Sequence, residues 1–387
     1  MKNIKLLNKI ASVGTDVFDK DNYTVSADVE NPDAIMVRSA VMHDYEFNPE
    51  LRAIARAGAG YNNIPVDKCA EAGIVVFNTP GANANAVKEL AIAALMLSSR
   101  KITEGIEWAK TISDEENVAK VVEKGKSNFA GCEIAGKTLG VIGLGAIGGM
   151  VANIATHLDM NVVGCDPYIS IDAAWRLSRS IKKAANYDDI YKVSDYITLH
   201  APVTPETKGM INKETIAQMK DGVRIINLAR ADLVNSADMI EALESGKVAS
   251  YVTDFPTNDI IGKKGVVAIP HLGASTEESE DNCAVMAARQ LVDFLELGNI
   301  TNSVNFPNVS IPHTGDYRIC IFHKNVPAIL SSISTIISNA NINIENLVNR
   351  SRGDYAYTLI EVKGEVPDAC VRAIEAGSGI LRVNVIK

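Results

Sequence analysis

Three glycines and one aspartate have the spacing of a nucleotide-binding turn. Gly143, Gly145 and Gly148 follow an apolar run directly, and a helical stretch opens from them. Asp166 closes the next apolar run, near the distance of about 20 residues expected for such a site. A preceding strand, an opening helix and a following acid make this pattern more specific than the glycines alone.

Each of these residues has a physical reason to bind a dinucleotide. Gly143 permits a tight turn, Gly145 lets the backbone approach a pyrophosphate, and Gly148 lets helix pack on strand. The helix N-terminus offers free N–H groups and a positive potential to the phosphates. Asp166 accepts from ribose hydroxyls and repels a 2′-phosphate, which favours NAD over NADP. The alternative is a glycine-rich turn that binds nothing, and the complete unit argues against it.

Two further residues predict hydride chemistry on a hydroxy acid. Arg230 and His271 each follow an apolar run, so both should lie at the carboxyl edge of one sheet. An arginine grips a carboxylate bidentately, and a histidine takes a hydroxyl proton near neutral pH. A carboxylate must orient that histidine, and Asp254 and Asp259 are both available. The alternatives are a salt-bridge partner for Arg230 and a hydrogen-bonded loop residue for His271.

The elements that position these residues alternate between strand and helix. Short apolar runs at Ala34–Val37 and Gly73–Phe77 end in polar residues, as in a parallel sheet with crossover helices. Further strands are expected at Thr138–Ile142 and Asn161–Cys165, on either side of the glycines. The sequence therefore predicts an α/β fold with two doubly wound parallel sheets, one flavodoxin-like and one a Rossmann domain.

The last seventy or so residues follow a different pattern, after a loop rich in proline and asparagine near Pro307. Strands at Arg318–Phe322, Ile342–Val348 and Tyr355–Val362 are interleaved with two amphipathic helices, and a strand at Leu381–Ile386 ends the chain. This βαββαβ order predicts a ferredoxin-like unit. Another break is expected in the polar stretch at residues 113–128.

Composition excludes several classes of protein. The chain has 387 residues, 22% of them charged and 47% apolar, with a net charge of −9, so it is not disordered and is a poor partner for nucleic acids or anionic membranes. No membrane span or signal peptide is visible. Six scattered cysteines and six histidines show no metal-ligand spacing. We expect a cytoplasmic protein with reduced thiols and no metal.

These motifs together resemble the D-isomer-specific 2-hydroxyacid dehydrogenases and, with the C-terminal unit, their phosphoglycerate dehydrogenase branch. The segments that carry the resemblance are Gly58–Ile64, Lys137–Gly148, Asn227–Arg230 and Pro270–Thr276. The resemblance implies that Arg230 binds and polarises the substrate and that His271 is the acid/base. It implies a cofactor site made of Gly143, Gly145, Ala146, Ile147, Gly148, Asp166, Ala201, Leu228, Ala229, Asp254, Gly273 and Ala274.

The resemblance also implies a domain plan and a substrate. A discontinuous substrate domain takes residues 1–94 and 283–309, the NAD domain residues 95–282, and a regulatory domain residues 310–387. A helix at Cys283–Leu297 fits the return of the chain to the substrate domain. Arg38, Ser39 and Arg56 then hold the phosphate of 3-phosphoglycerate, with Arg230 and His271 at the reacting end. The implied reaction is NAD-dependent oxidation of 3-phospho-D-glycerate. A non-phosphorylated hydroxy acid as substrate, or a non-catalytic sensor, is the alternative.

Three positions depart from the family pattern. The segment Asp254–Asp259 is one residue short and lacks the glutamate that usually pairs with the histidine. Counting from Asp254 puts Asn258 at the glutamate's place, whereas counting from Arg230 puts Asp259 there. We choose Asp259, because only a carboxylate stabilises an imidazolium. Asn62 stands in place of the usual aspartate and Ala231 in place of the usual glycine.

The C-terminal unit resembles an ACT domain, a module that senses amino acids. The resemblance implies that His323, Asn325 and Asn343 bind L-serine across a pair of such domains, in a homodimer or homotetramer. Ala328 replaces the usual glycine of the effector loop. The alternative is a dimerisation module that has lost its ligand.

Overall fold

The computed structural model describes residues 1–387 and divides the chain into two compact units. The first unit consists of Met1–Asn83 and Glu277–Lys387, and the second is Ala84–Thr276. Each boundary is the start of a helix, α3 (Ala84–Ser99) or α11 (Glu277–Leu297), so that neither helix is divided. The domain boundaries expected at residues 94 and 282 fall inside these two helices.

The N-terminal part of the first unit is a five-stranded parallel sheet in the order β2-β1-β3-β4-β5. The order reverses between β1 and β3, which is the flavodoxin-like arrangement expected from the sequence. Ligands bind at such a reversal, beyond the carboxyl ends of the strands. The elements are β1 (Lys2–Leu6), α1 (Ser12–Thr15), β2 (Tyr23–Ser26), β3 (Ala34–Val37), β4 (Ala53–Arg56), α2 (Val66–Glu71) and β5 (Val75–Phe77).

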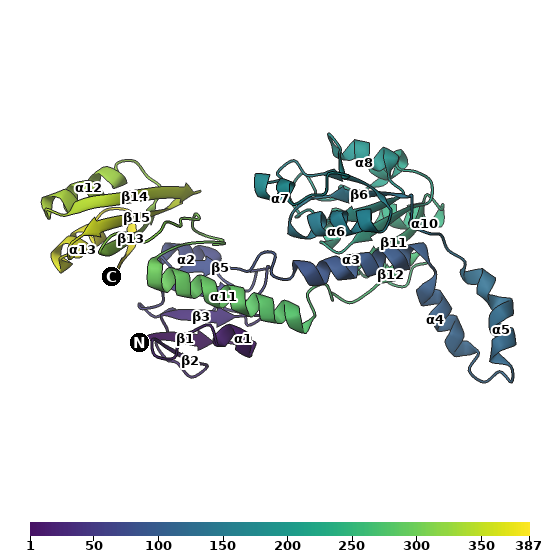
Figure 1. Cartoon of the computed structure of the whole chain (residues 1–387), viewed down its shortest axis with the longest axis horizontal. Coiled ribbons are helices and arrows are strands. Elements are labelled where there is room, and N and C mark those ends of the chain that lie inside the picture. The colour runs from purple at the N-terminus through teal and green to yellow at the C-terminus, as the bar shows by residue number, and fades with distance from the viewer. The chain divides into compact units, whose positions relative to one another are not determined.

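Helix α11 follows the second unit in the sequence but packs on the sheet of the first unit. It packs against β3, β4 and α1 through small and apolar residues, and Figure 1 shows it in green beside the purple strands. Helices α1 and α11 approach each other closely at Gly14, where an added Cβ would lie only 2.5 Å from the Cβ of Ala284. The sequence predicted this helix from Cys283, but it starts at Glu277 with three acids in its first turn, where the helix dipole favours them.

The second unit is a seven-stranded sheet in the order β12-β11-β10-β9-β6-β7-β8, and all its strand pairs are parallel. The order reverses between β6 and β9, as in the predicted Rossmann domain. Its strands are β6 (Thr138–Ile142), β7 (Asn161–Cys165), β8 (Lys182–Lys183), β9 (Tyr196–Leu199), β10 (Val223–Asn227), β11 (Val248–Thr253) and β12 (Val266–Ala268). Its further helices are α6 (Ala146–His157), α7 (Ile171–Trp175), α8 (Tyr187–Val193), α9 (Lys213–Gln218) and α10 (Ser236–Glu244).

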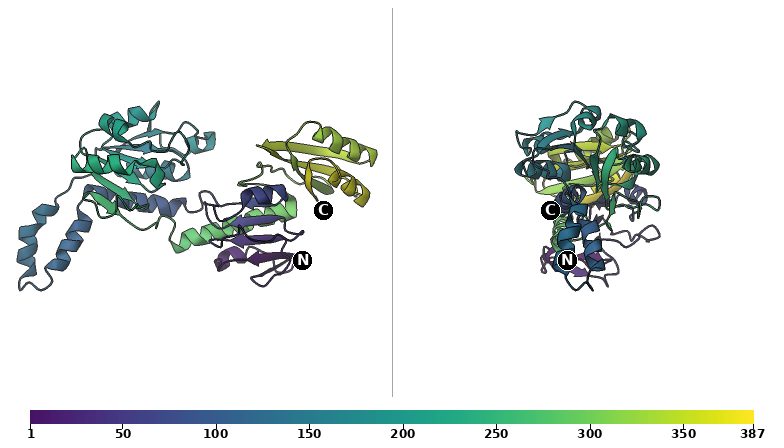
Figure 2. Two further views of the ribbon diagram at one scale, coloured as in Figure 1. Left: turned by 180° about the vertical axis from the view of Figure 1, so that it is seen from behind. Right: turned by 90° about the vertical axis from the view of Figure 1, so that its right-hand side faces the viewer.

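The polar stretch where a break was expected contains a helix. Helices α4 (Ile102–Thr111) and α5 (Val118–Gly125) form a hairpin that projects from the second unit (Figure 2). The rings of Trp108 and Phe129 pack together at 5.2 Å and join α4 to the short turn after α5. No helix of the molecule combines the length and the hydropathy that a membrane span requires.

The C-terminal part of the first unit is a four-stranded antiparallel sheet in the order β14-β15-β13-β16. The element order confirms the predicted βαββαβ pattern and is consistent with an ACT domain. Isoleucines from α12 and β13 fill the core on one face, while Phe322 and Tyr357 join the α11 core on the other. The elements are β13 (Tyr317–Lys324), α12 (Ile329–Asn339), β14 (Asn343–Arg352), β15 (Tyr355–Lys363), α13 (Asp368–Glu375) and β16 (Ile380–Ile386).

Candidate active site

The turn between β6 and α6 requires glycine at two of its three predicted positions. Gly143 has φ +88°, and a Cβ there would lie 2.7 Å from the carbonyl oxygen of His200. A Cβ on Gly148 would lie 1.9 Å from the carbonyl oxygen of Gly143. The backbones of β6, β9 and α6 therefore meet at this point, where the strand order reverses, and no larger residue fits.

The third glycine faces open space. Gly145 is the N-cap of α6, no side chain caps this helix, and a Cβ on Gly145 would meet nothing within 4 Å. Ala146 is exposed and Ile147 is half-buried in the first turn. The N–H groups at the start of α6 and its dipole are thus available to an anionic ligand such as a pyrophosphate.

Asp166 lies directly after β7 and fixes the glycine turn. Its Oδ2 accepts a hydrogen bond from the Leu144 N–H and its Oδ1 accepts one from the Tyr168 N–H, both at 2.9 Å. Each carboxylate oxygen keeps a lone pair for a further donor. The carboxylate is half-buried at the carboxyl edge of the sheet, which suits the ribose hydroxyls of a dinucleotide.

Asp254 is a buried carboxylate without a hydrogen-bond donor. It follows β11, is 1% exposed, and neither of its side-chain oxygens is hydrogen-bonded. Burial raises its pKa, and the charge of His271, the nearby Gly273 backbone and the charge of Arg230 offset the rise only in part. A buried carboxylate in this state is costly, so a ligand that brings an amide N–H would relieve it. The nicotinamide carboxamide of NAD is such a donor, and the residues present fit that cofactor.

The other predicted cofactor residues lie along the same edge of the sheet. Ala201 and Leu228 are buried after β9 and β10, while Ala229 and Ala274 are half-buried. All four are uncharged, which suits the walls of a cofactor cleft. No group of three or more His, Cys, Asp or Glu side chains is arranged to hold a metal ion.

Arg230 and His271 meet on one aromatic ring. The ring centroids of His271 and Phe255 are 4.3 Å apart, and the guanidinium carbon of Arg230 lies 5.6 Å from the Phe255 centroid. Both polar side chains are exposed, and the Arg230 guanidinium also donates to the carbonyl oxygen of Ala229 at 2.7 Å. The structure thus brings together the two residues that the sequence predicted as a catalytic pair, with Asp254 electrostatically coupled to both.

Asp259 and Asn258 are not part of this cluster. Both are exposed, and Asp259 forms no hydrogen bond or ion pair. The role assigned to Asp259 stays a prediction; the carboxylate that interacts electrostatically with His271 in the structure is Asp254.

Three residues of the site were missed at the level of sequence. Phe255 supports the catalytic pair, and the buried Asn227 side chain bonds to the backbone of Ala229 and Arg230. His200 lies against the glycine turn, and burial lowers its pKa to about 4, so its ring is neutral. Its Nε2 lies 2.9 Å from the Thr198 Oγ1. Their positions in the sequence could have indicated these three residues, since each one ends or closely follows a strand of this sheet.

Arg38 and Arg56 lie side by side in the first unit. Val37 pairs with Arg56 between β3 and β4, and the Arg56 Nε donates to the Arg38 carbonyl oxygen at 3.1 Å. Burial lowers the pKa of Arg56, and the charge of Arg38 lowers it further. Arg38 forms an ion pair with Glu280 in the first turn of α11. Two adjacent guanidiniums beyond the carboxyl ends of two strands suit a phosphate.

Ser39 follows Arg38 directly, and its backbone N–H is already bonded. The N–H groups of Arg38, Ser39 and Ala40 all donate to the Asn8 side-chain oxygen, at 2.9, 3.0 and 3.1 Å. The backbone donors of the loop are therefore occupied, and an anion must be bound by side chains.

The three predicted effector residues do not form one site within a single C-terminal sheet. His323 is buried, with its ring nitrogens next to the Lys324 carbonyl at 2.8 Å and the Thr358 hydroxyl at 2.9 Å. Asn325 follows the end of β13, whereas Asn343 begins β14 at the opposite end of the sheet, ~25 Å away along the strands. Ala328 takes the left-handed conformation expected of a glycine, with φ +67°.

A family model described as "D-isomer specific 2-hydroxyacid dehydrogenase, NAD binding domain" matches residues 92–273. The D-3-phosphoglycerate dehydrogenase of Archaeoglobus fulgidus is 36% identical over 295 residues, which are 73% of this chain and 53% of that protein. The Bacillus subtilis protein of the same name is 33% identical over 318 residues, 79% of this chain and 58% of its own length. This chain spans about half the length of the curated relatives it matches.

Solved structures agree with these relatives. The NAD+-bound 3-phosphoglycerate dehydrogenase of Entamoeba histolytica is similar with a TM-score of 0.61 and 26% identity, over 79% of this chain and 98% of that chain. The D-mandelate dehydrogenase of Rhodotorula graminis shares the fold, with a TM-score of 0.66 at 24% identity over 80% and 99% of the two chains. Residues 92–273 therefore carry the NAD-binding domain of the D-isomer-specific 2-hydroxyacid dehydrogenases, and the similarity to the D-3-phosphoglycerate dehydrogenases extends over 73–79% of the chain.

Proposed function

We propose that this chain is an NAD-dependent dehydrogenase that oxidises 3-phospho-D-glycerate to 3-phosphohydroxypyruvate, the first step of phosphorylated serine biosynthesis. The observation that carries the proposal is the pairing of Arg230 and His271 on Phe255, beside the unpaired carboxylate of Asp254 in an NAD-binding unit. The names of the sequence relatives support the phosphorylated substrate.

Each residue has a role that its chemistry allows. Arg230 binds the substrate carboxylate, because its guanidinium is always charged and has donors beyond the one that bonds to Ala229. His271 accepts the hydroxyl proton while the carbinol carbon loses a hydride and becomes a ketone carbon. NAD, when bound, accepts that hydride. The sequence assigns the stabilisation of the imidazolium at His271 to Asp259. We propose that Asp254 contributes to it, because Asp254 and His271 already interact electrostatically.

Arg38 and Arg56 bind the substrate phosphate. The burial of Arg56 and the charge of Arg38 beside it disfavour the charged form of Arg56 in the free protein, and a phosphate dianion would relieve this cost. Glu280 holds Arg38 until the phosphate replaces it.

We also propose that L-serine is an effector of a homodimer or larger assembly. Asn325 and Asn343 lie at opposite ends of one C-terminal sheet, too far apart for one small ligand to contact both. A ligand that contacts Asn325 and Asn343 together must therefore lie between two copies of the chain, with one residue from each copy. The observation that favours an effector is the exposure of these two amide side chains.

The experiment is NADH formation at 340 nm with 3-phospho-D-glycerate, D-glycerate or D-lactate, with and without L-serine. We expect Arg56→Gln to raise KM for the phosphorylated substrate at least about tenfold, the effect of about 1.4 kcal/mol of lost binding. The exposed Arg372 provides a matched control, Arg372→Gln, which should leave KM unchanged. Equal turnover of D-lactate and 3-phospho-D-glycerate by the wild type would contradict the proposed substrate.

A further inference from the structure

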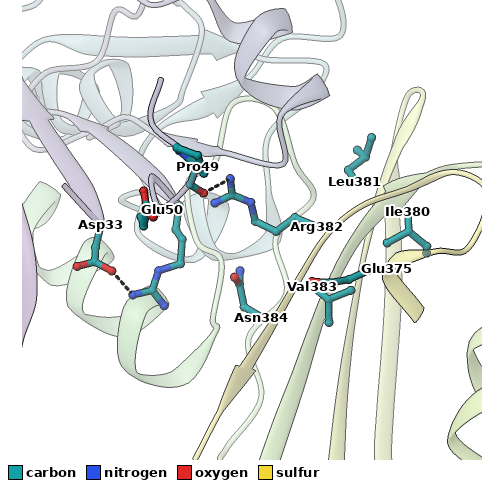
Figure 3. A pocket seen from close by; sticks show the side chains of 10 residues that line it. Asp33, Pro49, Glu50, Glu375, Ile380, Leu381, Arg382, Val383 and Asn384 are labelled. Carbon is teal, nitrogen blue, oxygen red and sulfur yellow. Dashed lines mark hydrogen bonds and ion pairs between the residues drawn. The ribbon is translucent and has the colours of Figure 1, made fainter. Parts of the chain in front are cut away.

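A cavity of about 510 Å³ lies inside the first unit, between its N-terminal sheet and strand β16. It is lined by Asp33, Pro49, Glu50, Arg52, Glu375, Ile380, Leu381, Arg382, Val383 and Asn384 (Figure 3). Asp33 and Arg52 immediately precede β3 and β4, whereas Arg38 and Arg56 lie at the carboxyl ends of the same two strands. The cavity is therefore separate from the candidate phosphate site.

Arg382 is the principal charge of this cavity, and no carboxylate is bonded to it. Its guanidinium donates to the carbonyl oxygens of Leu51 and Pro49. Burial lowers its pKa, the nearby charge of Arg52 lowers it further, and the charge of Glu50 offsets part of this lowering. A guanidinium has five N–H donors, so most of those on Arg382 remain for another acceptor.

Arg52 brings a second guanidinium to the same space. It forms an ion pair with Asp33 at 2.7 Å, and the other oxygen of Asp33 accepts from the Asn3 N–H at 2.7 Å. The residues that line the cavity therefore include two guanidiniums, Arg52 and Arg382, of which only Arg52 has a carboxylate partner. The carboxylates of Glu50 and Glu375 also line it and are exposed.

Asn384 adds a neutral polar group that is not hydrogen-bonded to another residue. Figure 3 shows Asn384 and Arg382 extending from β16 toward the segment of Pro49 and Glu50. The wall behind them is tightly packed, because a Cβ on Gly73 would lie 2.7 Å from the Cβ of Arg382. The polar groups thus face the cavity from a strand whose position is fixed by close contact.

We propose that this cavity binds a small carboxylate, with the carboxylate group between Arg382 and Arg52 and the Asn384 amide donating to it. A guanidinium binds a carboxylate through two parallel hydrogen bonds, and the ligand supplies the carboxylate partner that Arg382 lacks. The bound carboxylate links β16 to the start of β4.

The test is isothermal titration calorimetry of the full chain with sodium malonate at constant ionic strength. We expect malonate to bind the wild type and to bind Arg382→Gln at least tenfold more weakly. Asn384→Phe fills the cavity without removing a charge and should weaken binding to a similar extent. Arg372→Gln, at an exposed position of α13, and Arg38→Gln, at the candidate phosphate site, should keep the binding that Arg382→Gln loses.

Four results would overturn the proposal. They are no malonate binding by the wild type, unchanged binding by both Arg382→Gln and Asn384→Phe, loss of binding in Arg38→Gln alone, and inorganic phosphate binding as tightly as malonate. The readout is independent of enzymatic turnover, so a failure of the proposed dehydrogenase activity would not alter the outcome.

Discussion

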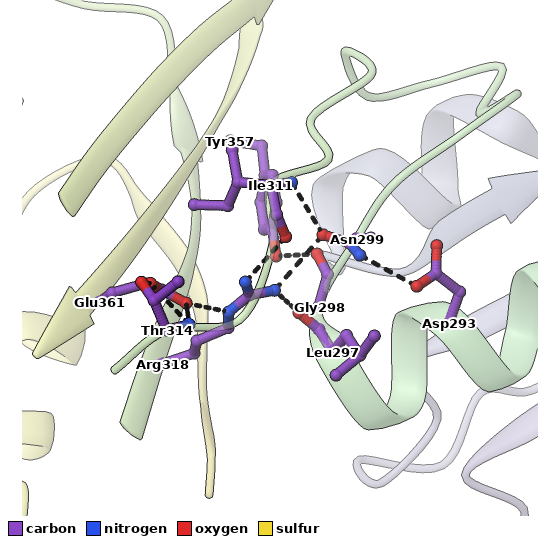
Figure 4. Close-up of polar contacts among 9 residues, drawn as sticks. All are labelled: Asp293, Leu297, Gly298, Asn299, Ile311, Thr314, Arg318, Tyr357 and Glu361. Atoms are coloured by element: carbon purple, nitrogen blue, oxygen red, sulfur yellow. Dashed lines mark hydrogen bonds and ion pairs between the residues drawn. The ribbon is translucent and has the colours of Figure 1, made fainter. Parts of the chain in front are cut away.

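Two carboxylates are almost completely buried in this molecule, and their surroundings are opposite. Glu361 on β15 is 0% exposed and accepts hydrogen bonds from the backbone and hydroxyl of Thr314 and from the Arg318 Nε at 2.7 Å (Figure 4). Asp254 in the NAD-binding unit is 1% exposed and accepts none. Burial raises the pKa of both groups, but the bonds at Glu361 outweigh burial and lower its pKa, whereas the pKa of Asp254 stays raised.

The hydrogen-bonded carboxylate of Glu361 belongs to a network that stabilises the fold. Arg318 also donates to the carbonyl oxygens of Leu297 and Ile311, and the Tyr357 hydroxyl donates to the Gly298 carbonyl oxygen at 2.6 Å. These bonds fasten the C-terminal sheet to the end of α11. The unsatisfied charge at Asp254 has no such structural partner. The difference supports the proposal that Asp254 accepts a hydrogen bond from a bound ligand, because native proteins rarely leave a buried carboxylate unpaired.

The largest effect on stability is expected from Glu361→Gln. The change leaves the Arg318 guanidinium buried without its counter-charge, so the free energy of unfolding should fall by about 3–5 kcal/mol. Urea unfolding measures it, with the exposed Glu345→Gln as the matched control. A loss below about 1 kcal/mol would show that the pair contributes no more than a surface ion pair.

The same pair predicts a pH dependence. The folded-state pKa of Glu361 is below its ordinary value of 4.5, so its stabilisation is complete above that pH and is lost as the pH falls through the folded pKa. The difference in unfolding free energy between wild type and Glu361→Gln should therefore shrink below pH 4.5. Unfolding curves at a series of pH values test this, and a constant difference would contradict it.

Asp254→Asn should act in the opposite direction on stability. Removing an unpaired buried charge is expected to raise the free energy of unfolding by about 1 kcal/mol, and to weaken NAD binding about tenfold. Thermal unfolding and a titration with NADH fluorescence measure the two effects on one sample. If Asp254→Asn destabilises the fold as strongly as Glu361→Gln, the distinction between the two carboxylates fails.

The smallest effect is expected from Glu280→Gln. Its ion pair with Arg38 is exposed, with each side chain 44% accessible, so the unfolding free energy should change by less than about 1 kcal/mol. The KM for 3-phospho-D-glycerate should fall about two- to fivefold, because Arg38 no longer has a competing partner. Steady-state kinetics of NADH formation measures it, and a higher KM would mean that Glu280 positions Arg38 instead.

The sequence was sufficient for features that depend on local spacing. The glycine turn, Asp166 and the pairing of Arg230 with His271 all follow from strands that end at one sheet edge. Helix α11 was predicted to start too late, because the acids of its first turn lack an apolar periodicity. The ion pair between Glu280, in the first turn of this helix, and Arg38 was therefore not predicted.

Contacts made by tertiary packing could not be predicted in this way. The position of Phe255 between Arg230 and His271 depends on the course of the loop after β11. That loop is one residue shorter than the family pattern, so the count that placed Asp259 beside His271 had no fixed reference point. The cavity at Arg382 joins segments more than three hundred residues apart, as the bond from Arg382 to Leu51 shows.

The most direct test of the assigned chemistry is the turnover of His271→Asn with 3-phospho-D-glycerate and NAD. We expect kcat to fall by about 10²–10⁴ while the affinity for NADH stays within twofold, because His271 is proposed to move a proton and not to hold the cofactor. Wild-type turnover in this variant would contradict the catalytic role of His271.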